Sequence, residues 1–250
     1  MANHLHDFLI HLGDNALILG HRLSELTGHG PVLEQDMAMT NIALDLVGQT
    51  RNIFQVAAKL QGGDATEDSI AYMRDATSYK NILLVEQKNG DFAKTVLRQF
   101  FYDAFNYHAY QRLLKSSNSD IAAIADKAIK EITYHLKWSA EWVIRLGDGT
   151  EESHRRISKA IDELWPYTGE MFKFTDYELA CYEEGIFPEI DGIKAEWDQE
   201  VNNIFTEATL TVPEDGWMHD GGKRGVHSEH LGFLLAEMQF LQRAYPGQEW

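Results

Sequence analysis

The sequence has little of what disulfides, irregular backbone or nucleic-acid binding require. Its 250 residues include one cysteine, Cys181, and only five prolines. A single cysteine excludes an intrachain disulfide and fits a reducing compartment, and we expect it to be a small buried hydrophobic residue. Scarce proline and valine favour helices over sheets. Acidic residues outnumber basic ones, 39 to 22, and the resulting net charge of -17 argues against nucleic acid or an anionic membrane surface as partner.

Long uncharged runs are also missing. No stretch reaches the ~18 apolar residues that suggest a membrane-spanning helix. Three histidines and Asp7 interrupt the first apolar run, so no signal peptide is expected. These features predict a soluble protein, and we expect it in the cytoplasm.

Apolar periodicity predicts helices along the whole chain. Leucines, alanines and aromatic residues recur in steps of three and four, which is typical of core-facing helical seams. The seams run over 5–26; over Leu33, Met37, Thr40, Leu44, Val47, Arg51, Phe54 and Ala58; over 92–113; over 121–142; and over a fifth helix with Ile157, Ile161, Leu164, Thr168 and Met171. Shorter helices are expected over 67–75, 176–184, 193–208 and 231–241. Long helices joined by short turns predict an all-α, up-down helical bundle, in one domain over 1–250.

Polar residues interrupt the seams of this predicted bundle. A buried carboxylate is costly unless it is paired or bound to a metal. The positions of interest, on or beside the seams, are Asp45, Asp103, Asn106, Glu131, His135 and Glu163. Their clustering in one core would need a physical reason.

The residue types at these positions do not fit a di-iron centre. Such a site in a helical bundle takes a Glu-x-x-His pair from each of two helices. The third seam instead carries Asp103 and Asn106, whose amide oxygen is a weak ligand where an imidazole is wanted. Glu131 and His135 are four residues apart, not three. We interpret the positions as a hydrogen-bonded polar network in a degenerate metal site, with no metal and no catalytic residue.

The segment 221–230 admits three interpretations. Its glycines, followed by Lys223 and Arg224, could approach a phosphate or a partner near a helix N-terminus. His227 and His230, with Glu229, could bind a metal. The third interpretation is a loop in which Ser228 is the N-cap of the next helix.

Four stretches together carry a family resemblance. Residues 33–51, 83–90, 127–135 and 227–239 closely resemble the PaaC family, the non-catalytic structural subunits of multicomponent phenylacetyl-CoA epoxidases. The resemblance runs from about Leu12 to Trp250. It implies a ferritin-like bundle with additional C-terminal helices.

The resemblance also implies a function within a complex. The catalytic subunit PaaA holds two irons, and the complex converts phenylacetyl-CoA to its ring-1,2-epoxide with dioxygen in phenylacetate catabolism. Electrons come from NADPH through a separate reductase with flavin and iron–sulfur groups. The expected partners are PaaA, the other epoxidase subunits and phenylacetyl-CoA at the assembled complex, and no cofactor is expected in this chain.

Two segments resemble the part of the family that lies near the CoA moiety. They supply the candidate contacts Arg74, Ser78, Tyr79, Lys80 and Asn81, and Leu179, Ala180 and Cys181. An anionic CoA needs local cations, which Arg74 and Lys80 could supply, and Tyr79 could stack on adenine. The alternative is a helix-end loop with solvated cations.

Three hypotheses for the function stay open at this point. The chain is a metal-free scaffold subunit of an oxygenase, a catalytic di-metal oxidase or oxygenase itself, or a helical interaction protein outside any oxygenase. A homodimer of the isolated chain is also expected, because apolar surface meant for a partner would be exposed.

Overall fold

The computed structural model describes residues 2–214 and 216–248. Within them every regular element is helical, which confirms the all-α prediction. The longer helices are α1 (Ala2–Ser24), α2 (Leu33–Gln61), α5 (Phe92–Leu113), α6 (Ser119–Gly147), α7 (Glu151–Leu164) and α9 (Ile193–Glu207). The shorter ones are α3 (Glu67–Tyr72), α4 (Leu83–Glu86), α8 (Asp176–Glu183), α10 (Glu229–Met238) and α11 (Phe240–Ala244). None of the described helices is long and apolar enough to span a membrane.

The chain divides into two compact units, which are described separately. Unit 1 comprises Met1–Lys88 and Asp220–Trp250, and unit 2 comprises Asn89–His219. The prediction of one domain over 1–250 includes residues 1, 215, 249 and 250, which lie outside the described part, and it stays a prediction.

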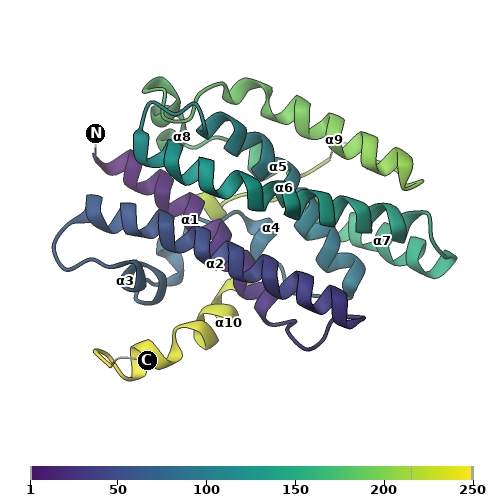
Figure 1. Ribbon diagram of the computed structural model, residues 1–250, viewed down its shortest axis with the longest axis horizontal. Coiled ribbons are helices and arrows are strands. Elements are labelled where there is room, and N and C mark those ends of the chain that lie inside the picture. Colours follow the sequence, from purple (N-terminus) through teal and green to yellow (C-terminus); the bar gives the residue numbers. More distant parts are fainter. Residues whose placement is uncertain (1, 215, 249–250) are drawn as a thin grey trace. The chain divides into compact units, whose positions relative to one another are not determined.

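Unit 1 is built on the antiparallel pair α1 and α2 (Figure 1). Helix α1 is buried on several sides: Phe8, Leu9 and Leu19 have no exposed surface. Asp14 and Asn15 are buried in the same helix, with 0% and 2% of their surface exposed. Two polar side chains in so apolar a helix need hydrogen-bond partners, and the functional site supplies them.

The predicted seam of α2 is largely wrong. Ile42, Leu46 and Ile53 are fully buried, whereas the predicted core residues Leu33 and Leu44 are 70% and 64% exposed. Helix α2 is therefore apolar on two faces, and the apolar periodicity in the sequence follows the exposed face. Only the end of the predicted seam, Phe54 and Ala58, lies in the core.

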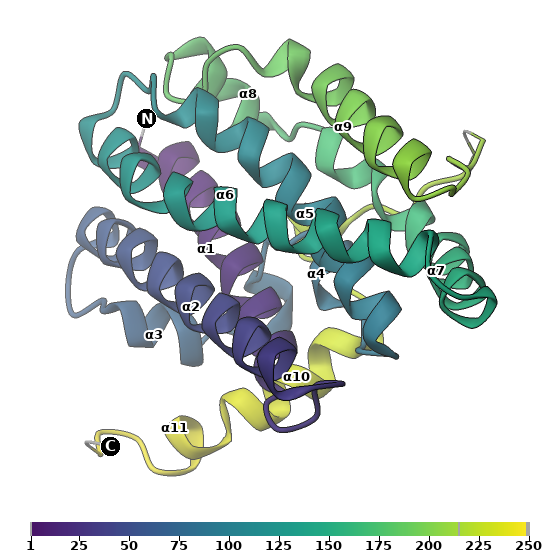
Figure 2. The ribbon, with the colours of Figure 1, turned by 45° about the vertical axis from the view of Figure 1, so that its right-hand side comes forward.

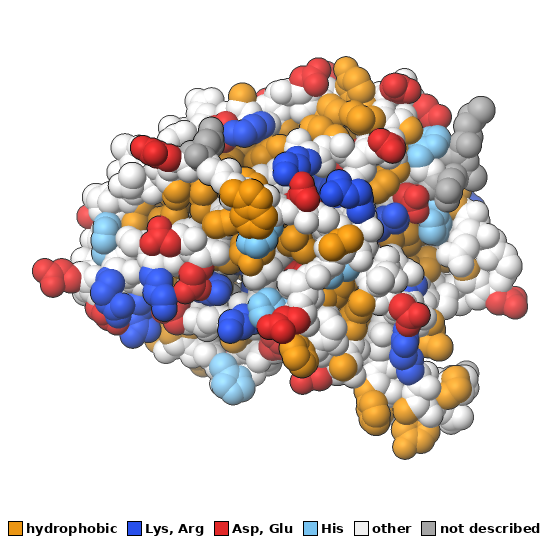
Figure 3. All heavy atoms as spheres, turned by 180° about the vertical axis from the view of Figure 1, so that it is seen from behind, with side chains coloured by type: hydrophobic (Ala, Val, Ile, Leu, Met, Phe, Trp, Pro, Cys, Tyr) orange, Lys and Arg blue, Asp and Glu red, His pale blue; other side chains and the backbone are white. Residues whose placement is uncertain are grey.

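The C-terminal helices of unit 1 differ in detail from the single helix predicted over 231–241. Ser228 caps α10, because its hydroxyl accepts a hydrogen bond from the backbone N–H of His230. The helix ends at Met238, and α11 begins at Phe240. Figure 3 shows hydrophobic side chains gathered over this C-terminal end, where Phe240 is 62% and Tyr245 56% exposed.

Unit 2 is built on the antiparallel pair α5 and α6, with α7 and α9 packed against α5 (Figure 2). Helix α5 begins as predicted: Asp91 caps it by accepting a hydrogen bond from the Lys94 backbone N–H at 3.0 Å. The core is rich in aromatic rings, and the indole N–H of Trp197 donates to the carbonyl of Phe101 at 3.0 Å. This bond satisfies the one polar group of a fully desolvated ring.

The fifth predicted helix is shorter than expected. Helix α7 ends at Leu164, and Trp165–Tyr167 form a 3₁₀ turn. Pro166 lacks an N–H and cannot continue the α-helical hydrogen bonding. Thr168 and Met171, placed on this helix by the periodicity, therefore lie beyond its end.

Candidate functional site

The first candidate site is the segment between α3 and α4, residues 74–81 of unit 1. Asp14 of α1 fixes this segment through hydrogen bonds from Arg74 and Lys80. The Asp14 carboxylate accepts hydrogen bonds from both terminal nitrogens of the Arg74 guanidinium and from the Lys80 backbone N–H at 2.8 Å. A fully buried carboxylate is thus neutralised by a bidentate cation, the arrangement that best offsets its desolvation.

Tyr79 lies inside this segment and not on its surface. Its ring has no exposed area, and the Arg74 guanidinium lies 4.1 Å from the ring centroid. The hydroxyl donates to the Ala71 carbonyl at 2.5 Å and accepts from the Gln239 amide at 2.9 Å. Burial raises the pKa of Tyr79. The expectation that Tyr79 stacks on adenine is therefore wrong in this structure, because both faces of the ring are covered by the protein.

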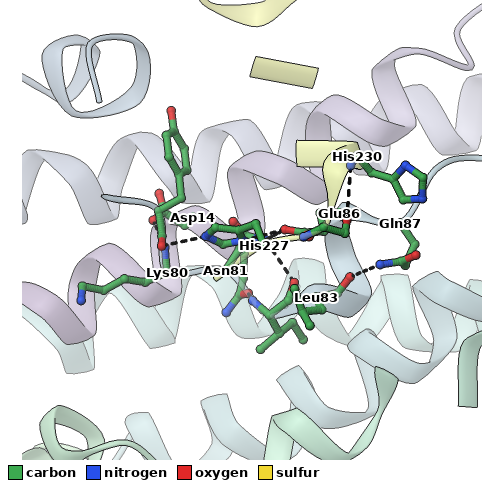
Figure 4. A network of polar contacts seen from close by, with 12 residues as sticks. Asp14, Lys80, Asn81, Leu83, Glu86, Gln87, His227 and His230 are labelled. Carbon is green, nitrogen blue, oxygen red and sulfur yellow. Dashed lines mark hydrogen bonds and ion pairs between the residues drawn. The ribbon is translucent and has the colours of Figure 1, made fainter. Parts of the chain in front are cut away.

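Glu86 of α4 organises the other end of the segment (Figure 4). Its carboxylate is fully buried and accepts hydrogen bonds from the Asn81 amide at 2.9 Å, the His227 ring at 2.8 Å and the Ser228 backbone N–H at 2.7 Å. The Glu86 backbone carbonyl accepts from Arg22 at 2.9 Å. The C-terminal segment of unit 1 is thereby tied to α1 and α4.

His227 is held as an imidazolium by this geometry. Its Nδ1 faces the Glu86 carboxylate, and its Nε2 lies 3.0 Å from the carbonyl oxygen of Tyr79. Both partners are acceptors, so both ring nitrogens must carry hydrogen. Burial lowers the pKa of His227, but the hydrogen bond and charge of Glu86 outweigh it and hold the pKa above its ordinary value.

The segment 221–230 is a loop that leads into the capped N-terminus of α10. With both nitrogens of His227 engaged, the ring has no lone pair for a metal. Ser228 is the N-cap, as in the loop interpretation. Gly225 has φ of +79°, and a Cβ at that position would lie 2.2 Å from the Thr77 carbonyl oxygen, so glycine is required there.

Only part of the predicted CoA segment reaches the surface. Ser78 is exposed, and the Lys80 ammonium is 3.8 Å from Asp7. Asn81 is fully buried on Glu86, and the side chain of Arg74 is 16% exposed. A CoA contact through this segment stays a prediction, and it depends on Ser78 and Lys80.

The second predicted CoA stretch lies on α8 in unit 2. Leu179 is 42% exposed and Ala180 is half-buried. Cys181 is fully buried, as expected, and burial raises the pKa of its thiol to about 12. It is therefore inert as a nucleophile, and contact through Leu179 and Ala180 stays a prediction.

The degenerate metal-site positions centre on Asp103 of α5. This carboxyl is 1% exposed and accepts hydrogen bonds from the Gln99 amide at 2.7 Å and the Ser139 hydroxyl at 2.9 Å. His135 and Asn106 are buried as well, with 1% and 4% of their surface exposed. Burial raises the pKa of Asp103 to about 7, although the charge of His135 and the bonds from Ser139 and Gln99 lower it.

The remaining predicted positions are more exposed than Asp103. The Glu163 side chain is 39% exposed and pairs with Lys94 at 2.6 Å, so its expected place beside the core is wrong. The Lys94 hydrogen bond holds the pKa of Glu163 below its ordinary value. Glu131 is half-buried, and Asp45, also half-buried, lies in unit 1.

Metal-ligand geometry is lacking in the described residues. No group of three or more His, Cys, Asp or Glu side chains there could hold a metal ion. A Glu-x-x-His string does occur, at Glu151 and His154, but it lies in the first turn of α7. There Glu151 is exposed, and the His154 ring is bonded to the Gly147 carbonyl at 2.7 Å. That string therefore belongs to a helix start and not to a metal site.

Sequence reasoning missed several members of both networks. Asp14 and Glu86 were not singled out, although each stands in an otherwise apolar stretch, which is the signal that could have found them. Gln99 and Ser139 lie one helical turn from Asp103 and His135, respectively, and could have been found by that spacing. Gln239 carries no such signal.

The His227–Glu86 pair predicts a pH-dependent stability. Because the folded-state pKa of His227 is raised, its contribution is fully present below the unfolded pKa near 6.5 and is lost as pH rises through the folded pKa. His227→Ala should lower the free energy of unfolding by about 1–3 kcal/mol at pH 6 and by less at pH 9. Urea unfolding at both pH values measures this, with the exposed His29→Ala as control. Equal losses at the two pH values would contradict the imidazolium assignment.

Asp103 predicts a loss of stability in the same direction, with rising pH, but over a lower pH range. A carboxyl whose pKa is raised from 3.8 to about 7 destabilises the fold progressively as pH rises through that window. Asp103→Asn removes the titration, so between about pH 4 and 7 the wild type should lose roughly 2–4 kcal/mol relative to the variant. Urea unfolding across this range tests it, with Asp126→Asn on the exposed side of α6 as control. A difference that does not change with pH would show that Asp103 titrates normally.

Comparison with known proteins gives a consistent assignment. The family of phenylacetic acid catabolic proteins, PaaA_PaaC, matches residues 1–250. The chain is 47% identical, over 248 residues, to the PaaC subunit of the 1,2-phenylacetyl-CoA epoxidase of Escherichia coli (strain K12), covering 99% of this chain and 100% of the relative. The resemblance and the ferritin-like, all-helical fold predicted from the sequence are thus confirmed. The chain belongs to the phenylacetic acid catabolic protein family.

Proposed function

We propose that the chain is the structural subunit of a phenylacetyl-CoA epoxidase, which forms the ring-1,2-epoxide in aerobic phenylacetate catabolism. It packs against the di-iron catalytic subunit PaaA and has no catalytic residue of its own. Full-length similarity to the PaaC subunit of the Escherichia coli enzyme supports this role. The epoxidation in this proposal uses dioxygen and electrons that reach PaaA from NADPH through the separate reductase.

The single observation that carries the proposal is the hydrogen bonding of Asp103. A buried carboxylate without an ion must be satisfied by donors of the protein. Here one oxygen accepts from Gln99 and the other from Ser139, both within 2.9 Å. Each oxygen of the carboxylate thus accepts a hydrogen bond from the protein, as expected of a polar network that needs no ion.

The same chemistry argues against a catalytic role for the chain alone. Asn106 presents an amide where an imidazole would be needed, and it cannot supply a strong nitrogen ligand. Burial raises the pKa of Asp103 in the metal-free chain, so the uncharged carboxyl is favoured there. The chain is therefore a non-catalytic subunit, and its contribution is to support a partner that does the oxygen chemistry.

Co-expression with PaaA in iron-replete medium tests the assignment. The chain should co-elute with PaaA in size-exclusion chromatography, and the complex should hold about two irons per pair. The chain expressed alone should hold none by elemental analysis. About two irons in the isolated chain would support a catalytic di-metal enzyme. A metal-free chain that does not associate with PaaA would support an interaction protein outside any oxygenase.

For the substrate, we propose that Lys80 and Ser78 contact the CoA portion of phenylacetyl-CoA. The backbone of this segment is fixed by Asp14 and Glu86, so the exposed Ser78 and the 25% exposed side chain of Lys80 are presented without a large ordering cost. Lys80 offers a cation on a protein of strongly negative net charge.

Lys80→Glu should weaken binding of phenylacetyl-CoA to the assembled complex by roughly tenfold, because a local attraction becomes a repulsion. Isothermal titration calorimetry on the complex measures it. Lys59→Glu makes the same charge change at an exposed position of α2 and should leave the affinity unchanged. Equal affinities for the Lys80 variant and the wild type would reject the contact, provided that both complexes stay assembled.

A further inference from the structure

The connection between α4 and α5 contains the sequence Asn89–Gly90, the one place in the chain where a glycine follows an asparagine. It lies at the junction of the two compact units, since the first stretch of unit 1 ends at Lys88 and unit 2 begins at Asn89. Asn89 is half-buried and Gly90 is exposed, and neither belongs to a helix. This bond is therefore open to solvent and is not held in a helical hydrogen-bond pattern.

An asparagine followed by a glycine has a side reaction of its own. The backbone nitrogen of the glycine attacks the side-chain amide carbon, Cγ, of the asparagine and closes a succinimide ring. Glycine favours this attack because it has no side chain to crowd the nitrogen and its backbone is the most permissive. In a folded protein the reaction depends on whether the nitrogen is available and whether the amide carbonyl is polarised.

The attacking nitrogen is available in this turn. Among the residues that the structure describes, none accepts a hydrogen bond from the Gly90 N–H. The stem of Lys94 occupies the space that a side chain at this position would need: a Cβ on Gly90 would lie 2.8 Å from the Lys94 Cδ. The Lys94 ammonium is in turn bound to Glu163 at 2.6 Å. The packing of α5 thus favours glycine at the position where glycine also makes the bond labile.

The amide carbonyl of Asn89 is polarised by a cation. The Arg98 guanidinium donates a hydrogen bond to the Asn89 Oδ1 at 2.7 Å. Arginine has no acceptor, so the side-chain atom that faces it must be the carbonyl oxygen and not the amide nitrogen. Arg98 is 1% exposed on α5, so its position is fixed by the core of unit 2. Negative charge develops on Oδ1 as the ring closes, and a donor fixed at that atom stabilises the charge as an oxyanion hole does.

We propose that Asn89 is a site of spontaneous deamidation and that Arg98 activates its amide for the reaction. The Gly90 nitrogen bonds to Cγ of Asn89, and the side-chain nitrogen leaves as ammonia, which takes up the proton from the Gly90 nitrogen. Water then opens the succinimide at either carbonyl. Opening on one side gives aspartate and opening on the other gives isoaspartate. One water is consumed and one ammonia is released, and nothing is oxidised or reduced.

Both products change the junction between the units. Aspartate at position 89 places a carboxylate where the amide oxygen faces Arg98, so that a charge-assisted pair replaces a bond to a neutral group. Isoaspartate instead routes the main chain through the former side chain and lengthens it by one carbon. Either product adds a negative charge, and the modified fraction increases with the age of the protein.

Timed incubation of the full chain in mildly alkaline buffer, followed by peptide mapping with mass spectrometry, tests the site. Asn118 is the control within the same chain, because it is also half-buried and is followed by the small Ser119. Its Oδ1, however, accepts from the neutral backbone N–H groups of Asp120 and Ile121. Asn89 should deamidate at least roughly tenfold faster than Asn118, because only Asn89 has a cation at the carbonyl oxygen.

A second comparison isolates the contribution of Arg98. Unfolding the wild type in urea breaks the contact with Asn89, so this residue should deamidate at least as fast in the folded chain as in the unfolded one. Arg98→Lys keeps a cation but loses the planar donor that faces Oδ1, and it should slow the reaction several-fold in the folded chain. Arg155→Lys, at an exposed position of α7, is the matched control and should not change the rate. If Arg98→Lys does not fold, the comparison of folded and unfolded wild type still decides.

Three results would overturn the inference: Asn89 that stays intact in the folded chain, deamidation no faster than at Asn118, or faster deamidation in urea than in buffer. In each case the bond from Arg98 would only anchor the turn. Asn89→Gln should abolish the new products, because its longer side chain closes a larger ring slowly. Their persistence in this variant would place the reaction at another residue. All of these outcomes are independent of association with PaaA, on which the proposed function depends.

Discussion

The desolvation cost of a buried carboxylate is the constraint that organises the polar structure of this protein. Asp14, Glu86 and Asp103 are each at most 1% exposed, and each would destabilise the fold as an isolated charge. Each is compensated in a different way. Asp14 has a permanent cation in Arg74, Glu86 has a titratable cation in His227, and Asp103 accepts hydrogen bonds from the neutral side chains of Gln99 and Ser139 and feels the charge of His135.

These three solutions have different consequences for the surrounding backbone. Asp14 and Glu86 also accept backbone N–H groups, from Lys80 and Ser228, so their charge orders a loop and a helix start. Asp103 accepts its hydrogen bonds from side chains of α5 and α6, and burial raises its pKa to about 7. Charge therefore orders the segment 74–81 and the start of α10, whereas burial favours the uncharged form of Asp103.

The sequence predicted the elements of the fold better than their orientation. The predicted seam over 92–113 coincides with helix α5, because apolar periodicity and helix caps are short-range signals between neighbouring residues. The face of α2 that packs into the core was not predicted correctly. Periodicity finds apolar stripes, but it cannot distinguish a stripe that meets the protein's own core from one that is left exposed. The predicted place of Glu163 beside the core was wrong for a related reason, because its partner Lys94 comes from another helix.

Buried polar residues could be predicted from the sequence, but their partners could not. Asp103 and His135 were found because each interrupts an apolar seam. The partner of a buried charge, however, is set by tertiary contact, as with His227 and Glu86, which are 141 residues apart. A pattern within one helix can show that a charge is buried, but only the packing of distant segments shows how it is neutralised.

The two apolar faces of α2 connect this architecture to assembly. Burial of the inner face requires only the rest of unit 1, but retention of large apolar residues at Leu33, Met37 and Leu44 has no benefit for an isolated chain. The exposed stripe is thus better explained by a partner than by folding. The hydrogen bonds that satisfy Asp103 without an ion, and the exposed apolar residues of α2, therefore both fit the proposed role of a subunit that binds a partner.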